Sequence, residues 1–308
     1  MVFEEIMINQ FIQSFSTHLL DLFFKIITYF GSPIPWFVLG AWLFWLGKEK
    51  KSFTVMSLLL IGSFFSGLFK SIIARPRPEG IKILDNVVGS SFPSGHSTIA
   101  GIAAVYAFLS REIKKNFKYL ILVLALLTAI SRMYLGVHYL SDVIAGLFLG
   151  SIIALVVYKF EAKINKTEFH ISKIREEFII VIFFVALIVF NLFVPSEYYG
   201  AYALLGYFLG YAIYRHTKLA EVMVRAKTTN QKIVILFFGT AIFGVMGALA
   251  YFVFTGIIAQ ITFFSAGIFI TLIWPIVISK FVKKREEVKA NRFTGKAKKK
   301  INSKKKKK

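Results

Sequence analysis

The stretch FKYLILVLALLTAISRMYLGVHYLSDVIAGLFLGSIIALVVYKF, residues 117–160, decides the fold. It holds two apolar runs, 117–135 and 139–159, each close to the ~20 residues with which a helix crosses a bilayer. Polar residues gather where the two runs meet, among them Ser131, Arg132, His138 and Asp142. The sequence therefore predicts two membrane-spanning helices joined by a short turn that carries ionisable groups.

The rest of the chain repeats this apolar pattern. Of its 308 residues, 56% are hydrophobic and 17% are aromatic, whereas a soluble domain is about 45–50% apolar. Seven further apolar runs cover 33–47, 52–73, 95–111, 178–194, 198–214, 233–253 and 262–282. The predicted fold class is therefore all-α, a polytopic membrane helix bundle with about nine transmembrane helices. Because the chain has no cysteine, a disulfide scaffold and a thiolate metal site are both excluded.

The basic residues follow alternate loops. Lys and Arg number 38 against 16 Asp and Glu, and 32 of the 38 lie in 48–51, 111–118, 159–175, 215–232 and the tail from Lys280. An excess of Lys and Arg marks cytoplasmic loops, so these segments and the C-terminus are predicted to be cytoplasmic. The net charge of +22 then reflects topology and requires no nucleic-acid partner.

The first 31 residues carry a polar stripe. Its members are spaced three or four residues apart: Gln10, Ser14, His18, Asp21 and Lys25. This spacing places them on one face of a helix, and an amphipathic helix favours the membrane interface. We therefore expect 1–31 to form an interfacial helix on the outer surface, with a tenth span as the alternative. No cleavable signal peptide is expected, because a basic start and a small-residue cleavage site are missing.

Six basic residues remain on the predicted outer face: Lys25, Lys70, Arg75, Arg77, Lys82 and Arg132. A single Lys or Arg near the end of a span can extend to the interface, but six on the disfavoured side require a reason. Lys70 and Arg77 lie at the outer end of the second span, where Pro76 and Pro78 stop the helix. This outer end is the first of three polar segments.

The other two polar segments begin the third span and join the fourth to the fifth. Phe92-Pro93-Ser94-Gly95-His96-Ser97 opens the third span, and the unpaired N–H groups of a helix start suit an anion. Gly95 lets that anion approach the backbone closely. His138 and Asp142 are four residues apart and share a helical face, so the carboxylate can hold one imidazole nitrogen. With Arg132, these groups predict a phosphate site with a nucleophile and an acid.

Other polar residues and glycines are assigned structural roles. Arg75 and Lys82 are expected only to line the site entrance, and Asp85 and Glu79 are expected to be solvated loop charges. Two glycine pairs predict close helix packing, Gly146/Gly150 and Gly206/Gly210.

The three polar segments also resemble a known family. Lys70 with Arg77-Pro78, Pro93-Ser94-Gly95-His96, and Ser131-Arg132 with His138 and Asp142 are similar in type, order and spacing to the three signature motifs of the type 2 phosphatidic acid phosphatase superfamily. The resemblance covers roughly residues 1–160 and implies phosphoryl transfer through a phosphohistidine. It makes His138 the nucleophile, Asp142 its orienting partner and His96 the general acid. The implied phosphate ligands are Lys70, Arg77, Ser94, Gly95 and Arg132, with Pro78, Pro93 and Ser131 in support.

The function implied is hydrolysis of a phosphomonoester or diphosphate on a membrane lipid, a polyprenyl diphosphate or a phospholipid phosphate. A lipid-to-lipid phosphotransferase using the same site is the alternative. A transporter is less favoured. It would require paired repeats and charges at the membrane midplane, and the sequence shows neither. No cofactor and no metal are expected, since three cations would repel Mg²⁺.

Four regions are expected along the chain: the interfacial helix 1–31, a catalytic lipid-phosphatase helix bundle 32–160, additional transmembrane helices 161–282 of unassigned role, and a disordered Lys-rich cytoplasmic tail 283–308. The tail is too polar to bury a core and is expected to contact anionic lipid headgroups. The protein is predicted to be a multi-pass protein of the cell membrane, with its active site on the extracytoplasmic face.

Overall fold

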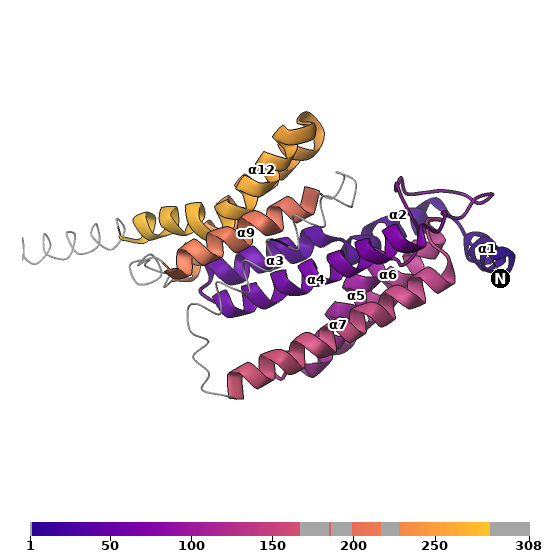
Figure 1. Cartoon of the computed structure of the whole chain (residues 1–308), viewed down its shortest axis with the longest axis horizontal. Coiled ribbons are helices and arrows are strands. Elements are labelled where there is room, and N and C mark those ends of the chain that lie inside the picture. The colour runs from indigo at the N-terminus through magenta and orange to yellow at the C-terminus, as the bar shows by residue number, and fades with distance from the viewer. Residues whose placement is uncertain (1, 167–184, 186–198, 217–227, 284–308) are drawn as a thin grey trace, which may run out of the picture. The chain divides into compact units, whose positions relative to one another are not determined.

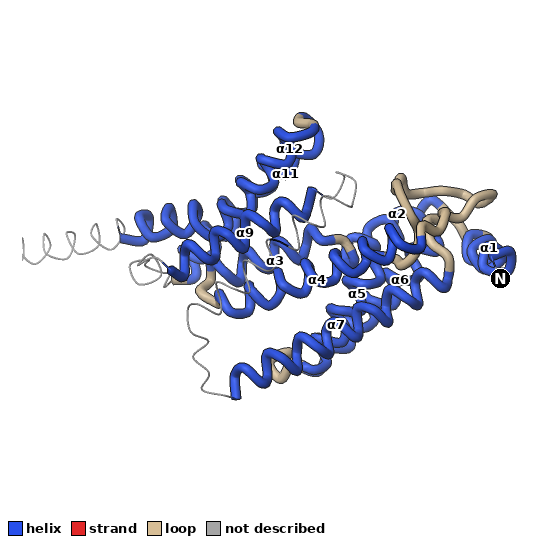
Figure 2. The backbone as a smooth tube through the Cα atoms, viewed as in Figure 1, coloured by secondary structure: helices blue, strands red, loops and turns tan. Residues whose placement is uncertain are grey.

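The protein is helical wherever its structure is described. The structure is a computed structural model, and it describes residues 2–166, 185, 199–216 and 228–283. Figure 2 shows helices and loops without a strand in this part of the chain, which confirms the predicted all-α class. In chain order the main elements are α1 (Val2–Gln13), α2 (His18–Ile27), the 3₁₀ turn η1 (Thr28–Gly31), α3 (Pro33–Trp45), α4 (Glu49–Ile73), α5 (Gly95–Leu109), α6 (Lys115–Tyr134), α7 (Leu140–Lys166), α9 (Tyr199–His216), α11 (Thr229–Ala248), the π turn η2 (Leu249–Val253), α12 (Gly256–Ile268) and the π turn η3 (Phe269–Ile273).

Several of these helices are long and apolar enough to cross a membrane, so the protein is multi-pass. Five qualify: Glu49–Ile73, Lys115–Tyr134, Leu140–Glu161, Thr229–Val253 and Gly256–Lys283. The count is six when His18–Gly31 and Pro33–Trp45, bent by 48° at their junction, are taken as one span. The prediction of about nine spans is not confirmed, because five or six qualify among the described residues and α5, for example, has only 15 residues. The predicted span 178–194, apart from residue 185, and the tail beyond Lys283 lie outside the described residues.

The N-terminal segment corrects one prediction, because its polar stripe does not run along a single helix. α1 ends at Gln13, and α2 begins at His18 after Thr17 caps it by accepting from the Leu20 N–H at 3.2 Å. The Ser14 hydroxyl donates to the Phe11 carbonyl at 2.7 Å. Ser and Thr hydroxyls compete in this way for backbone groups and start a new helix. The break turns 1–31 into two short helices and the turn η1.

The chain forms two compact units. The first comprises Met1–Gly40 and Ser52–Tyr198, and the second comprises Ala41–Lys51 and Tyr199–Lys308. All three predicted polar segments belong to the first unit. They lie at the ends of α4, α5, α6 and α7, which Figure 1 labels. In the second unit α9 packs on α12, and a Cβ at Gly206 would overlap the backbone of Phe264. The assignment of 32–160 as the catalytic bundle and of 161–282 as additional helices stays a prediction.

Three helix boundaries in the first unit are set by local backbone conformation and capping. α4 stops at Ile73, because Ala74 adopts a left-handed φ of 47° and Pro76 follows. Gly136, with a φ of 76°, makes the turn between α6 and α7. α5 begins after Ser94, whose side chain accepts from the Ser97 N–H. These three breaks fall in the three polar segments.

Close packing of α5 on α7 fixes two of these segments relative to each other. A Cβ at Gly101 would lie 2.5 Å from the Leu147 carbonyl oxygen, and one at Gly146 would lie 2.5 Å from the Ser94 carbonyl oxygen. At Gly150 a Cβ would overlap the Thr98 backbone. Only glycine permits backbones this close, so the packing role predicted for Gly146 and Gly150 is confirmed.

We expect Gly150→Ala to destabilise the protein by about 1–3 kcal/mol, because the neighbouring atoms are backbone and cannot move aside cheaply. Thermal unfolding in detergent measures the effect as a lower midpoint. Gly244→Ala is the matched control, since nothing lies within 4 Å of its Cβ and alanine is the better helix former. Equal midpoints for the two variants would contradict the packing argument.

Candidate active site

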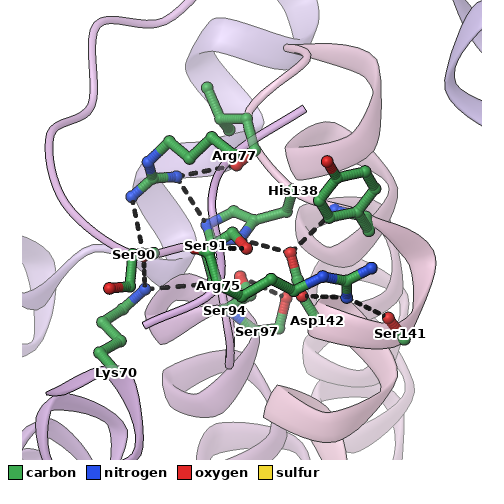
Figure 3. Close-up of polar contacts among 12 residues, drawn as sticks. Lys70, Arg75, Arg77, Ser90, Ser91, Ser94, Ser97, His138, Ser141 and Asp142 are labelled. Atoms are coloured by element: carbon green, nitrogen blue, oxygen red, sulfur yellow. Dashed lines mark hydrogen bonds and ion pairs between the residues drawn. The ribbon is translucent and has the colours of Figure 1, made fainter. Parts of the chain in front are cut away.

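The three polar segments meet at one end of the first unit. The Ser94 N–H, before α5, donates to the Asp142 carbonyl of α7 at 3.0 Å. The Arg77 guanidinium, from the loop after α4, donates to the Val137 carbonyl at 2.8 Å. Figure 3 shows Lys70, Arg77, His138 and Asp142 around this junction. Residues up to about seventy positions apart in sequence are thus brought together.

Lys70 and Arg77 converge on the same stretch of loop backbone. Lys70 Nζ donates to the Ser90 carbonyl at 2.5 Å, and Arg77 Nη2 donates to that same carbonyl at 3.3 Å. Arg77 also donates through Nε to the Gly89 carbonyl at 2.9 Å and lies with Nη1 3.5 Å from His138 Nε2. Two cations therefore stand side by side next to an imidazole, an arrangement that suits an anion.

His138 is almost wholly buried and lies beside Asp142. Its Nδ1 is 3.4 Å from Asp142 Oδ2 and has no hydrogen-bond partner, so the pair is in contact without a well-formed hydrogen bond. The same carboxylate oxygen accepts from the Tyr139 N–H at 2.9 Å. Burial lowers the pKa of His138 well below its ordinary value, and the charges of Arg132 and Lys70 lower it further. The imidazole is therefore neutral, and hence nucleophilic, near pH 7.

His96 occupies the first turn of α5, next to the cap. The Ser94 hydroxyl accepts from the Ser97 N–H at 3.3 Å and from the Ser97 hydroxyl at 3.0 Å. His96 itself is partly exposed. Burial and the charge of Arg132 lower its pKa well below the ordinary value, so an anion bound beside it is needed before it can carry a proton near pH 7. A Cβ at Gly95 would meet only the Ser66 hydroxyl, at 3.4 Å. Ser94 is engaged in capping, and its predicted role as a phosphate ligand stays a prediction.

Arg132 is fully buried and only partly paired. Its Nη1 donates to the Thr28 hydroxyl at 2.7 Å and to Asp85 Oδ2 at 2.9 Å, while its Nε and Nη2 have no hydrogen-bond partner. Buried N–H groups of a guanidinium are costly to leave unpaired, and they point to an anion as their partner. The neighbouring Ser131 hydroxyl donates to the Thr128 carbonyl of its own helix at 2.6 Å.

Two expectations about loop charges are wrong. Asp85 is the ion-pair partner of Arg132 and not a solvated charge. Arg75 does more than line an entrance, because its Nη1 lies 2.7 Å from Asp142 Oδ1. Lys82, by contrast, is half exposed and pairs with Asp21 at 3.1 Å. The loop from 74 to 94 has no periodic pattern, so nothing in the sequence indicated these partners.

The described helices form an apolar bundle that holds a buried imidazole, a carboxylate and clustered cations. These features are those of a membrane protein that binds an anion. The family model described as the PAP2 superfamily matches residues 51–166. Phosphatidylglycerophosphatase B of Bacillus subtilis is 33% identical over 141 residues, which cover 42% of this chain and 67% of that protein. The chain belongs to the PAP2 superfamily, as its motifs predicted.

Other relatives match about half of the chain. The lipid A 4'-phosphatase of Porphyromonas gingivalis is 31% identical over 160 residues, which cover 46% of this chain and 66% of that protein. The crystal structure of Aquifex aeolicus LpxE, with 30% sequence identity and a TM-score of 0.44, covers 49% of this chain and 93% of the other. The match to the two curated relatives spans about two thirds of their length and less than half of this chain.

Proposed function

We propose that this protein is a membrane lipid phosphatase that hydrolyses a phosphomonoester or diphosphate through a phosphohistidine on His138. One observation carries the proposal: the buried imidazole of His138 lies between a carboxylate at 3.4 Å and a guanidinium at 3.5 Å. The names of the relatives support the reaction class, because they include a phosphatidylglycerophosphatase, a lipid A phosphatase and an undecaprenyl-diphosphatase.

In the first step the proposed nucleophile is Nε2 of His138, because Nδ1 faces Asp142. Nε2 forms a bond to phosphorus as the bond from phosphorus to the lipid oxygen breaks, and His96 donates a proton to that oxygen. Asp142 stabilises the positive charge that develops on the ring. Lys70, Arg77 and the unpaired N–H groups of Arg132 neutralise the phosphoryl oxygens.

In the second step water attacks phosphorus and the bond to Nε2 breaks. His96, left neutral by the first step, accepts the proton of that water. Free phosphate leaves, and both imidazoles return to their starting protonation states. Without water in this role, a lipid hydroxyl would take the phosphoryl group instead.

Phosphate release from a panel of lipid phosphates tests the proposed function. The purified protein in detergent is expected to release inorganic phosphate from at least one of phosphatidic acid, phosphatidylglycerol phosphate, a sphingoid phosphate and a polyprenyl diphosphate. Release without any added lipid acceptor favours hydrolysis over transfer. Turnover only when a second lipid is supplied would make the protein a phosphotransferase.

We expect turnover to survive chelation. Lys70, Arg77 and Arg132 supply positive charge of the kind that Mg²⁺ supplies in metal-dependent phosphoryl transfer, and cations repel a metal ion. An excess of EDTA should therefore leave the rate of phosphate release within about twofold. Vanadate, which resembles the five-coordinate transition state, should inhibit. Loss of activity in EDTA that Mg²⁺ restores would contradict the mechanism.

We further propose that the site opens on the extracytoplasmic face and that the C-terminus is cytoplasmic. The alternation of basic loops supports this orientation. Val88→Cys, in an exposed part of the loop beside the site, should react with an impermeant thiol reagent on whole cells, whereas Asn116→Cys should not. The native chain has no cysteine, so the background is nil. Labelling at 116 and not at 88 would reverse the orientation.

A further inference from the structure

Helix α1 lies outside the segment 51–166 that matches the family, yet it contacts the stretch of chain that carries His138 and Asp142. Asn9 is fully buried, and its Nδ2 donates to the backbone carbonyl of His138 at 3.0 Å. One turn earlier on the same helix, Glu5 accepts from Arg75 Nη2 at 2.8 Å and from the Ser141 hydroxyl at 3.1 Å. Two side chains of α1 are thus fastened to the segment that carries His138.

Arg75 connects Glu5 to the carboxylate of Asp142. Its Nη1 donates to Asp142 Oδ1 at 2.7 Å and to the Ser141 hydroxyl at 2.5 Å. Its guanidinium carbon stands 4.0 Å from the centre of the Tyr139 ring, within cation–π range. The carboxylate is therefore held from both sides, with Arg75 on Oδ1 and the Tyr139 N–H on Oδ2. Only Oδ2 faces the His138 ring.

These contacts give Arg75 a different role from the cations that are proposed to bind phosphate. The Asp142 side chain is fully buried, and a buried carboxylate needs a charge partner close by. Although burial lowers the pKa of Arg75, Glu5 and Asp142 together raise it above its ordinary value. Arg75 therefore stays charged and forms ion pairs with two carboxylates, those of Glu5 and Asp142. Its position suits orientation of Asp142 and not binding of substrate.

We propose that α1 is a positioning element of the catalytic centre, in which Asn9 holds the backbone of His138 and Glu5 holds Arg75 against Asp142. The proposal rests on the proposed function, because it takes His138 as the nucleophile. Asn9, Glu5 and Arg75 act through His138 and Asp142 and touch no reacting atom. The other face of α1 carries apolar residues that are exposed, such as Met7 and Phe11.

The electrostatics of this arrangement predict opposite effects on the pKa of His138 for two substitutions that each remove one charge. Arg75→Gln removes a positive charge beside the catalytic pair, which favours protonated His138 and raises its pKa. Glu5→Gln removes a negative charge and leaves Asp142 as the only carboxylate paired with Arg75, which lowers the pKa of His138. The other charged groups around His138 are the same in both variants: Asp142 on α7, Arg132 on α6, Lys70 on α4, Arg77 in the loop and His96 on α5.

The experiment measures the pKa of His138 and the kinetic constants in the full-length protein. NMR of ¹⁵N-histidine protein in detergent, with His138→Gln to assign the signal, gives the pKa without requiring turnover. Phosphate release from the active lipid gives kcat and KM. The variants are Glu5→Gln, Asn9→Leu, Arg75→Gln and Arg75→Lys. Two controls lie nearby: Gln10→Ala, which changes an exposed neighbour of Asn9, and Lys82→Gln, which breaks the ion pair with Asp21.

We expect kcat to fall about tenfold to a hundredfold in Arg75→Gln and Asn9→Leu, the loss typical of residues that orient a functional histidine from behind, with KM little changed. The pKa of His138 should rise in Arg75→Gln, fall in Glu5→Gln and stay unchanged in Arg75→Lys, which keeps the charge. The two controls should match wild type. A purely structural role would lower the yield of folded protein without moving the pKa in opposite directions.

Unchanged kcat together with an unchanged pKa of His138 in Arg75→Gln and Glu5→Gln would overturn the proposal. If Arg75→Gln fails to fold, Glu5→Gln decides, because its isosteric side chain keeps the hydrogen-bonding oxygen. If no lipid phosphate is turned over by wild type but the pKa shifts occur as described, the positioning contacts stand and the proposed function fails.

Discussion

His138→Ala is expected to reduce phosphate release by at least about 10⁴-fold, to a rate near background. The variant removes the only imidazole that has both a carboxylate at 3.4 Å and a guanidinium at 3.5 Å within the described residues. Loss of a nucleophile costs orders of magnitude, because the remaining groups can only bind the substrate. The alanine leaves Arg77 and Lys70 on their loop carbonyls, so lipid binding should persist.

A matched control distinguishes chemistry from folding. His18→Ala changes an exposed histidine on α2 and should retain full activity. Size-exclusion elution and the thermal midpoint in detergent should be close to wild type for both variants. Phosphate release by His138→Ala at more than about a tenth of the wild-type rate would exclude His138 as the nucleophile.

His96→Ala is expected to stop turnover at a different point. Without a general acid the lipid oxygen leaves slowly, and without a general base water attacks the phosphohistidine slowly. A substrate with a good leaving group, such as an aryl phosphate, bypasses the need for the acid. We therefore expect a burst of one equivalent of phenol from His96→Ala with such a substrate, followed by a rate about 10²–10⁴-fold below wild type.

The burst distinguishes His96 from a residue that only binds phosphate. Lys70→Met lacks a phosphate ligand but keeps both imidazoles, so it should show a weaker apparent affinity and no accumulation of phosphorylated protein. A steady-state rate in His96→Ala equal to that of wild type would mean that another group transfers the proton.

The parts of the site that sequence could predict are those with regular spacing or a helix boundary. His138 and Asp142 are four residues apart at a helix start, Ser94 precedes α5, and Lys70 and Arg77 surround the end of α4, which two prolines impose. Apolar runs on either side fix which ends of the helices meet. Glycine at 146 and 150 indicated close helix packing, because its spacing is that of one helix turn, although the spacing did not identify α5 as the partner.

The partners of these residues could not be predicted, because they depend on the path of irregular chain. Asp85 reaches Arg132 only through the course of the loop after α4. Arg75 reaches Asp142 because that loop turns back over the start of α7. Asn9 contacts His138 across 129 positions of sequence, and the break at Thr17 that frees α1 from α2 is a matter of local hydroxyl competition. Regular residue spacing in the sequence cannot predict contacts of this kind.

Trapping the covalent intermediate tests the central claim most directly. Wild type and His96→Ala are mixed with a substrate carrying a labelled terminal phosphate, quenched without acid and digested for peptide mapping. We expect one phosphoryl group per chain on the peptide that contains His138, stable in base, labile in acid, and more abundant in His96→Ala than in wild type. Absence of label from both proteins during active turnover of wild type, or an acid-stable label on another peptide, would contradict the phosphohistidine mechanism.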